Sequence, residues 1–166
     1  DAPGVEEVAR ALALDYVYFP ASIAPKTKRD FGNAVLSPWP IDSAAKLPLP
    51  HPSRVLGQAR AAVAARVCIG GRAVRVYSVH CGSPFGISDG QRRAQVEAIL
   101  GDARRYGDPV IVGGDFNSVG VGRVLVADGF AWSTRRIGAT RGRYPFDHVF
   151  ARGFGPAAAG PNPRAN

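Results

Sequence analysis

Apolar residues in the first part of the chain recur with two different periods. Between residues 5 and 12 they are spaced as on one face of a helix, with two glutamates among them, and this spacing predicts an amphipathic helix. Short apolar runs at residues 16–19 and 33–36 each predict a strand. The first of these strands is expected to end at Pro20, because proline cannot donate a hydrogen bond to a neighbouring strand.

A proline-rich segment and a hairpin pattern occupy the middle of the chain. Residues 37–54 hold five of the fourteen prolines, which predicts a long loop with room for a short strand around Ile41. Residues 59–69 and 72–80 are two apolar segments separated by two glycines, and this pattern predicts a β-hairpin.

The hairpin also decides how the two cysteines lie. A turn at the two glycines places Cys68 opposite Ala73, and it places Cys81 opposite Arg60. The two sulfur atoms are then too far apart for a disulfide. Two free cysteines give no information about the redox compartment.

A second helix is predicted from its first turn. Ser88 precedes a stripe of apolar residues at helical spacing, and Gln91 follows three residues later, which is the sequence pattern of a capping box. Gly107 is expected to end this helix. Residues 109–113 form a short apolar strand of the kind that is buried on both faces. Two shorter patterns follow, a helix at residues 121–127 and a strand at residues 146–150.

The composition is that of a folded domain. Hydrophobic residues make up 46% and charged residues 20% of the 166 residues, which excludes a disordered chain. No apolar run approaches the roughly 20 residues that a bilayer-spanning helix needs. Mixed strands and helices with a hairpin indicate an α/β sandwich. The chain contains no methionine, so we expect it to be a processed or partial product.

The net charge of +8 has two interpretations. All but three of the 21 basic residues are arginines, which fits a bias of composition toward this residue. The same arginines also suit a surface that attracts phosphate, because the guanidinium group matches phosphate oxygens. The basic residues are scattered along the sequence, so the charge alone does not decide between these interpretations.

Polar side chains with possible catalytic roles stand at the ends of the predicted strands. They are His80, Asp115, Asn117, Asp147 and His148. Such positions commonly present functional groups. Each residue also has a purely structural interpretation: a satisfied core histidine for His80, an Asx-turn for the Asp-x-Asn pair, and a strand-end ion pair with arginine for Asp147.

Asp115 and Asn117 form the sharpest of these patterns. In an extended segment, residues two apart point the same way, so a carboxylate and an amide face one spot. The carboxylate can hold a hard cation or orient a water molecule, and the amide can donate to an anionic oxygen. The pair is therefore a candidate site for phosphate chemistry.

Five segments, taken in order, resemble the endonuclease/exonuclease/phosphatase superfamily of metal-dependent phosphoesterases. These segments are Gly32-Asn33-Ala34-Val35-Leu36-Ser37, Val76-Tyr77-Ser78-Val79-His80, Gln91-Arg92-Arg93-Ala94-Gln95 through Ile99-Leu100, Gly114-Asp115-Phe116-Asn117 and Phe146-Asp147-His148-Val149-Phe150. The resemblance covers about residues 5–153. It implies a four-layer α/β/β/α sandwich of two mixed β-sheets flanked by helices. Residues 1–153 then form an incomplete domain, and residues 154–166 form an irregular tail.

The resemblance implies a role for each matching residue. Asp115 would orient the attacking water near the metal, Asn117 would contact the scissile phosphate, and His80 would bind a phosphate oxygen. Asp147 would hold the catalytic histidine in its tautomer. The metal, Mg²⁺ or Mn²⁺, would lie at Asp115 and Asn117. His148 occupies a variable position of the family and is not expected to be the catalytic base.

Two elements of the family have no match in the chain. One is a metal-binding Gln-Glu pair upstream of the first helix, and the other is a Ser-Asp-His element downstream of residue 147. We therefore expect a fragment truncated at both ends, with weak or no activity.

Two functions follow from the sequence. The first is metal-dependent hydrolysis of a phosphoester, by a phosphodiesterase or phosphatase that acts as a monomer on nucleic acid or on a phospholipid head group. The alternative is a basic nucleic-acid-binding or catalytically inactive fragment of the same fold, whose affinity would fall steeply with salt.

Overall fold

The computed structural model describes residues 3–23, 30–53 and 57–155. The elements, in chain order, are α1 (Pro3–Ala11), β1 (Asp15–Ile23), β2 (Asp30–Ser37), β3 (Ile41–Ser53), β4 (Gln58–Ile69), β5 (Arg72–His80), α2 (Asp89–Ala103), β6 (Val110–Asp115), α3 (Gly122–Ala127), β7 (Ala131–Trp132) and β8 (Asp147–Arg152). Residues 156–166 of the predicted tail lie outside the described residues, as do residues 1 and 2.

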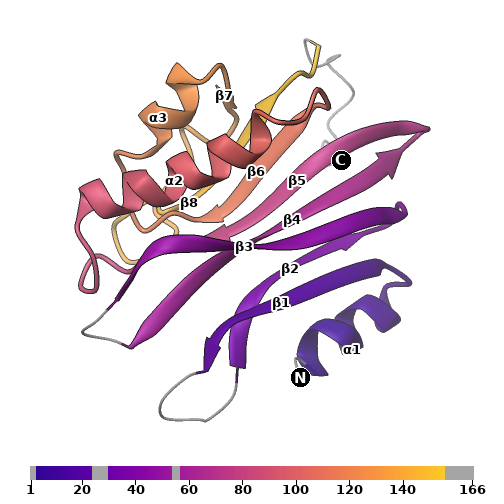
Figure 1. Ribbon diagram of the computed structural model, residues 1–166, viewed down its shortest axis with the longest axis horizontal. Coiled ribbons are helices and arrows are strands. Elements are labelled where there is room, and N and C mark those ends of the chain that lie inside the picture. The colour runs from indigo at the N-terminus through magenta and orange to yellow at the C-terminus, as the bar shows by residue number, and fades with distance from the viewer. Residues whose placement is uncertain (1–2, 24–29, 54–56, 156–166) are drawn as a thin grey trace, which may run out of the picture.

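These elements are arranged in layers (Figure 1). The larger sheet has the order β3-β4-β5-β6-β8-β7 and is mixed, because β5 and β6 are parallel and the other neighbours are antiparallel. The smaller sheet is the antiparallel pair β1-β2. Helices α2 and α3 cover one face of the larger sheet, the smaller sheet packs on the other, and α1 packs on β1. The predicted α/β/β/α sandwich is confirmed.

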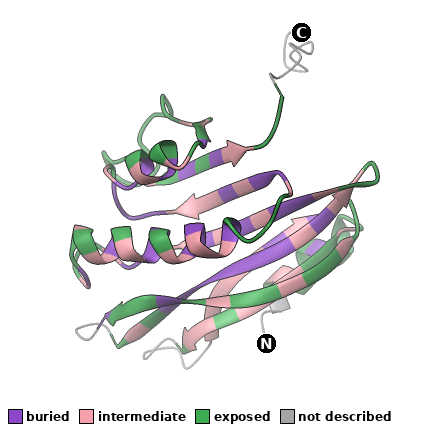
Figure 2. Ribbon diagram, turned by 45° about the horizontal axis from the view of Figure 1, so that its top comes forward, coloured by how far each residue is buried: buried purple, intermediate pink, exposed green. Residues whose placement is uncertain are grey.

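Strand β4 is buried on both faces of the larger sheet (Figure 2). Ala62 and Ala64 face the main core beneath the helices, together with the apolar residues of α2. Val63 and Ala65 point the other way, into a smaller core that they share with Val35 of the smaller sheet. Burial on both faces explains the unbroken apolar sequence of residues 61–65 in β4, because successive residues of a strand face opposite sides.

The predicted hairpin and the predicted second helix form as expected. Ile69 pairs with Arg72 across the two-glycine turn, and Cys68 pairs with Ala73, so both cysteines are free. Helix α2 begins at the predicted capping box, in which Ser88 accepts from the Gln91 backbone and the Gln91 side chain accepts from the Ser88 backbone. The helix ends at Ala103, earlier than the predicted Gly107.

The interpretation of residues 37–54 as a long loop is wrong, because most of this segment is the long strand β3. This strand lies at an edge of the larger sheet and, within the part of the chain that the structure describes, pairs only with β4. A proline is tolerated on an edge strand, since its missing N–H leaves no inner neighbour unpaired. The same reason lets β1 continue through Pro20 to Ile23, with a register shift directly after the proline. The two-residue strand β7 was not predicted.

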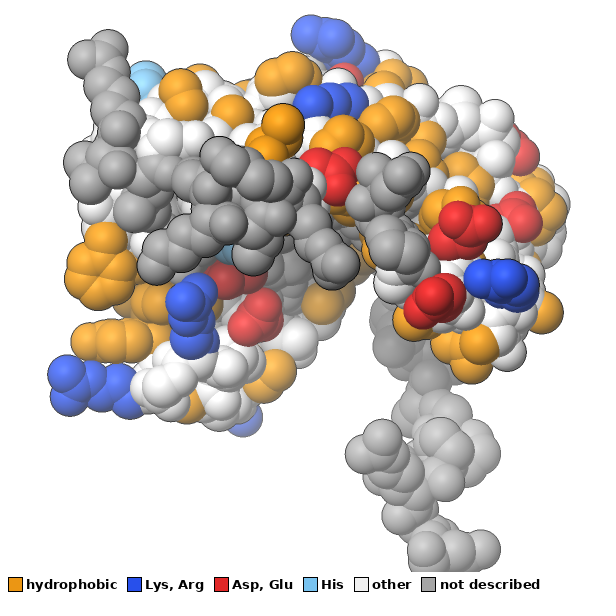
Figure 3. All heavy atoms as spheres, turned by 90° about the horizontal axis from the view of Figure 1, so that it is seen from below, with side chains coloured by type: hydrophobic (Ala, Val, Ile, Leu, Met, Phe, Trp, Pro, Cys, Tyr) orange, Lys and Arg blue, Asp and Glu red, His pale blue; other side chains and the backbone are white. Residues whose placement is uncertain are grey.

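No helix within the described ranges is long and apolar enough to cross a membrane. Basic, acidic and hydrophobic side chains are interspersed on the face seen in Figure 3. This agrees with the scatter of basic residues along the sequence and differs from the single basic stripe that is typical of a dedicated nucleic-acid-binding surface.

Candidate active site

The strand register brings three of the four predicted catalytic residues together, at the same end of three neighbouring strands of the larger sheet. His80 ends β5 and pairs with Asp115, which ends the parallel strand β6. Asp115 in turn pairs with Asp147, the first residue of the antiparallel strand β8. The carboxyl ends of adjacent strands are a common place for binding sites in α/β sheets.

A glycine next to Asp115 lets its strand approach β5 closely. Gly114 has a φ of +143°, and a Cβ atom at this position would overlap the carbonyl oxygen of Val79. Only glycine fits such a position without strain. Gly114 therefore allows the close backbone approach that positions the Asp115 carboxylate at the end of β6.

Asn117 holds the carboxylate of Asp115 in place. The backbone N–H of Asn117 donates to Asp115 Oδ1 at 2.8 Å, and its side-chain Nδ2 donates to the carbonyl of Cys81 at 3.1 Å. Asn117 adopts a φ of +51°, a conformation that asparagine tolerates better than most residues. Its buried Oδ1 atom has no hydrogen-bond partner among the described residues. The loop after β6 thus fixes one oxygen of Asp115 and leaves a buried amide oxygen without a protein donor.

The other oxygen of Asp115 faces two basic groups. Asp115 Oδ2 lies 3.7 Å from His80 Nε2 and 3.9 Å from Arg141 Nη1. His80 Nδ1 lies 3.5 Å from Arg60 Nη1. Because a guanidinium group only donates, Nδ1 of the neutral imidazole has to accept, and its proton then lies on Nε2, facing the carboxylate. Burial and the charge of Arg60 lower the pKa of His80.

Arg60 and Arg141 were not assigned a role from the sequence. Arg60 lies on β4 across from the end of β5, where the hairpin register had already placed it opposite Cys81. Burial lowers the pKa of Arg60, and the charge of Asp115 acts in the opposite direction. Arg141 belongs to an arginine-rich segment, residues 135–143. A local run of arginines near a catalytic motif was the one signal that could have indicated it.

Asp147 and His148 point to opposite sides of β8. Asp147 is exposed, and its backbone N–H donates to Thr140 Oγ1 at 3.1 Å. His148 is 3% exposed, lies 3.2 Å from Thr134 Oγ1 through Nδ1, and packs edge-on against Trp132. His148 is therefore a core residue.

The described residues include oxygen donors that could hold a divalent cation. They contain no group of three or more His, Cys, Asp or Glu side chains that could hold a metal. Asp115 Oδ2 and Asn117 Oδ1 are hard oxygen donors of the kind that Mg²⁺ prefers. Mg²⁺ commonly takes one or two protein oxygens and completes its shell with water and phosphate oxygens. The unpartnered amide oxygen of Asn117 fits this chemistry.

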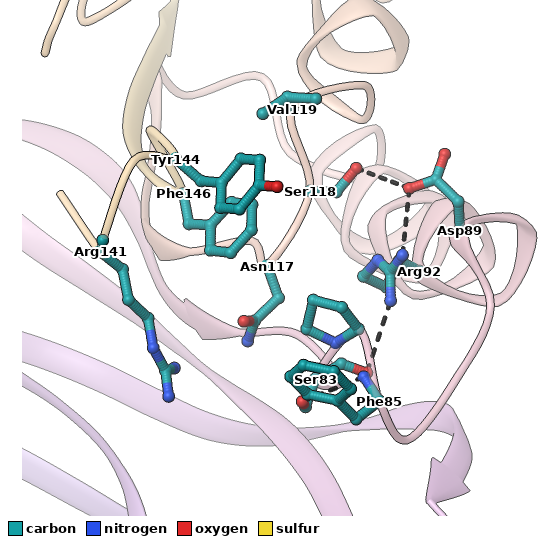
Figure 4. Close-up of a pocket in the computed structure, with 12 residues that line it drawn as sticks. Ser83, Phe85, Asp89, Arg92, Asn117, Ser118, Val119, Arg141, Tyr144 and Phe146 are labelled. Atoms are coloured by element: carbon teal, nitrogen blue, oxygen red, sulfur yellow. Dashed lines mark hydrogen bonds and ion pairs between the residues drawn. The ribbon is translucent and has the colours of Figure 1, made fainter. Parts of the chain in front are cut away.

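A cavity of about 500 Å³ adjoins the Asp115 site (Figure 4). Its walls come from the loop after β5, the start of α2, the loop after β6 and the segment before β8. The lining residues are Ser83, Pro84, Phe85, Asp89, Arg92, Asn117, Ser118, Val119, Arg141, Gly142, Tyr144 and Phe146. We call it the aromatic cavity. Asn117 and Arg141 belong to both the cavity and the Asp115 site.

A second set of contacts connects residues that line the cavity. Ser118 Oγ donates to Asp89 Oδ1 at 2.6 Å, and this hydrogen bond lowers the pKa of the Asp89 carboxyl. Asp89 also lies 3.4 Å from Arg92 Nη2. The start of α2 and the loop after β6 are therefore tied together beside the site.

Fold and site together define a class of protein. An α/β/β/α sandwich that presents histidine, aspartate and asparagine at adjacent strand ends, with arginines around them, is suited to phosphoester chemistry. A sequence model described as the Endonuclease/Exonuclease/phosphatase family matches residues 3–164, and the chain belongs to this family. Members of the family hydrolyse phosphoester bonds. A search of curated protein sequences found no match.

Solved structures show the same fold at low sequence identity. The catalytic domain of human Nocturnin with a bound sulfate anion is 16% identical, with a TM-score of 0.70 over 89% of this chain and 63% of that one. An endonuclease/exonuclease/phosphatase from Beutenbergia cavernae is 20% identical, with a TM-score of 0.67 over 89% and 49%. Sphingomyelinase C from Streptomyces griseocarneus is 20% identical, with a TM-score of 0.63 over 91% and 66%. The chain spans less than two thirds of each.

Proposed function

We propose that the protein is a Mg²⁺- or Mn²⁺-dependent phosphoester hydrolase whose reaction takes place at Asp115. The observation that supports this most is the convergence of His80, Asp115 and Asn117 with two arginines at one edge of the sheet. A carboxylate surrounded by cationic and amide donors can bind a phosphate and direct water toward it.

Asp115 is proposed to orient the attacking water. Its Oδ1 is held by the Asn117 backbone, so Oδ2 is the oxygen left to accept a proton or a hydrogen bond from water. A divalent cation bound at Asp115 and Asn117 would neutralise phosphate charge and lower the pKa of a bound water. The hydrogen bonds of Asn117 to Asp115 and to Cys81 position both side chains without this ion.

The phosphate would be held by His80 and the arginines. The Nε2–H of neutral His80 is a donor beside the Asp115 carboxylate, within reach of a phosphate oxygen. Arg141 is 68% exposed and lies at the same carboxylate, so it can turn toward an incoming anion. The sulfate anion in the human Nocturnin structure is a tetrahedral oxyanion, which agrees with an oxyanion site in this fold.

Asp147 is proposed to hold a catalytic histidine in its tautomer. Asp147 is exposed at the start of β8, in register with Asp115, so an imidazole could approach its carboxylate from the solvent. His148 is buried on the opposite side of the strand and does not serve this purpose.

The test is hydrolysis of a generic phosphodiester with Mg²⁺, compared with EDTA. We expect slow turnover by the 166-residue chain and faster turnover by any longer natural form that adds a metal-binding glutamate and a histidine. Asp115→Asn should lower the rate by at least about 100-fold, because it removes the water-orienting charge and keeps the shape.

Asp108→Asn is a matched control, since this carboxylate pairs with Arg66 away from the site. The proposal fails if Asp115→Asn is as active as the unchanged protein, or if no form hydrolyses the diester with Mg²⁺. Salt-sensitive binding of nucleic acid without cleavage would favour the alternative of a binding fragment.

A further inference from the structure

The walls of the aromatic cavity contain exposed rings with no evident role in folding. Phe85 is 90% exposed, and Tyr144 is 46% exposed. Both line the cavity, together with Phe146. Large apolar side chains that are exposed together at a cavity commonly mark a place where a ligand or partner binds.

The rings are held in position by the backbone. Tyr144 and Phe146 stack with centroids 5.3 Å apart and planes 5° from parallel, so one ring supports the other, and we call this stacked pair the Tyr144–Phe146 wall. Thr140 fixes this segment, because its Oγ1 accepts from the Phe146 N–H at 3.0 Å. Phe85 is raised on a turn in which the N–H of Gly86 donates to the carbonyl of Ser83 at 2.9 Å. Figure 4 shows the stacked pair on one side of the cavity and Phe85 on the other.

The cavity adjoins the proposed phosphate site. Asn117 donates its N–H to Asp115, Arg141 lies beside the same carboxylate, and both residues line the cavity. A group that enters the cavity is therefore next to a phosphate bound at Asp115. The position of that phosphate rests on the proposed function.

The charges at the cavity select between two kinds of substrate. A flat, aromatic group attached to a phosphate fits stacked rings with arginine beside them. A cationic lipid head group would meet Arg141 and Arg143, whose guanidinium carbon lies 5.6 Å from the Tyr144 ring centroid. Asp89, the one carboxylate among the described lining residues, is already bound by Ser118 and Arg92.

We propose that the aromatic cavity is a subsite for an unpaired nucleobase that flanks the scissile phosphate. The substrate is then a nucleotide or a single strand, whose base stacks between Phe85 and the Tyr144–Phe146 wall while Arg141 contacts the phosphate. A base inside a duplex is covered by its neighbours and cannot enter this cavity without leaving the stack.

The experiment measures binding, so that it does not depend on turnover. A short fluorescent single-stranded oligonucleotide and an abasic phosphodiester strand of the same length are titrated with the 166-residue chain in EDTA. We expect the strand with bases to bind at least about ten-fold more tightly, and Phe85→Ala to remove about ten-fold of its affinity, the usual effect of losing one stacked ring. The abasic strand should bind Phe85→Ala and the unchanged chain equally.

Two further variants separate stacking from other effects. Tyr144→Phe keeps the ring and should keep the affinity, whereas Tyr144→Ala should lower it. Trp39→Ala is the control, because this 45% exposed ring lies between β2 and β3, outside the cavity lining. Equal affinity for the two strands, or a Trp39→Ala effect as large as that of Phe85→Ala, would overturn the proposal.

A lipid substrate gives a different result. If the chain sediments with sphingomyelin or phosphatidylcholine vesicles, depends on Phe85 to do so, and prefers neither strand, the rings are a membrane contact and the subsite is refuted. Loss of hydrolysis in Asp115→Asn with unchanged base-dependent binding supports both proposals separately.

Discussion

At the scale of single residues, two adjacent glycines before Asp115 carry different constraints. A Cβ at Gly114 would collide with the Val79 backbone, and the residue has a positive φ. A Cβ at Gly113 would make only an ordinary contact, 3.7 Å from Val149 Cγ2. The two positions share a strand and a residue type, so the difference between them reports the positive φ of Gly114 together with the close approach of β5 and β6.

We expect Gly114→Ala to lower the free energy of unfolding by about 3 kcal/mol, because both strain and overlap have to be relieved. Gly113→Ala should cost less than about 1 kcal/mol. Urea denaturation of the two variants measures both values. Equal costs would mean that β5 and β6 can separate without loss, contrary to the close backbone contact described above.

At the scale of elements, a buried polar network joins α2 to β5. Arg75 is 4% exposed and binds Asp102 of α2 at 3.0 Å, while the Tyr77 hydroxyl donates to the same carboxylate at 2.6 Å. The Arg75 guanidinium also lies 4.2 Å from the Tyr106 ring centroid. Burial and the hydrogen bond to Asp102 raise the pKa of Tyr77, so its hydroxyl stays protonated as a donor.

Asp102→Ala should destabilise the protein by about 3–5 kcal/mol, because it leaves the Arg75 charge buried without its partner. Glu97→Ala on the same helix is the control. Its side chain is 52% exposed, so less than about 0.5 kcal/mol is expected. Thermal and urea denaturation measure the difference, and a loss of similar size in both variants would contradict a specific role for the network.

At the scale of the whole molecule, stability should depend on pH near neutrality. Burial lowers the pKa of His148 in the folded chain, and the pKa of His80 is lowered too. The unfolded chain therefore takes up protons first as the pH falls below about 6.5, and the folded chain resists them. The free energy of unfolding is thus expected to decrease as the pH falls through this range.

His148→Gln removes one of these protonations. Between about pH 7.5 and about pH 5.5, the free energy of unfolding of this variant should fall less than that of the unchanged chain. A smaller slope should remain from His80. Urea denaturation at both pH values tests this, and an unchanged slope in His148→Gln would assign the dependence to other groups.

Much of this architecture could be predicted from local patterns. The hairpin register, the capping box of α2 and the strand before Asp115 follow from spacing that neighbouring residues fix by themselves. Strand β3 could not be predicted in this way, because its prolines are tolerated only at a sheet edge and position in a sheet is not a local property. The place of Arg141 likewise depends on how its loop folds over Asp115.

One crossover supplies most of the proposed site. His80 ends β5, Asp115 ends β6, and the self-capped helix α2 joins the two strands. Segments that are close in sequence close short loops and tend to assemble early in folding. The reacting groups are therefore set by a compact module, whereas Phe85 and Tyr144 lie on loops, one between β5 and α2 within the crossover and the other before β8. Changes in those loops can alter what the protein binds, over evolution or in design, without rebuilding the centre that carries the chemistry.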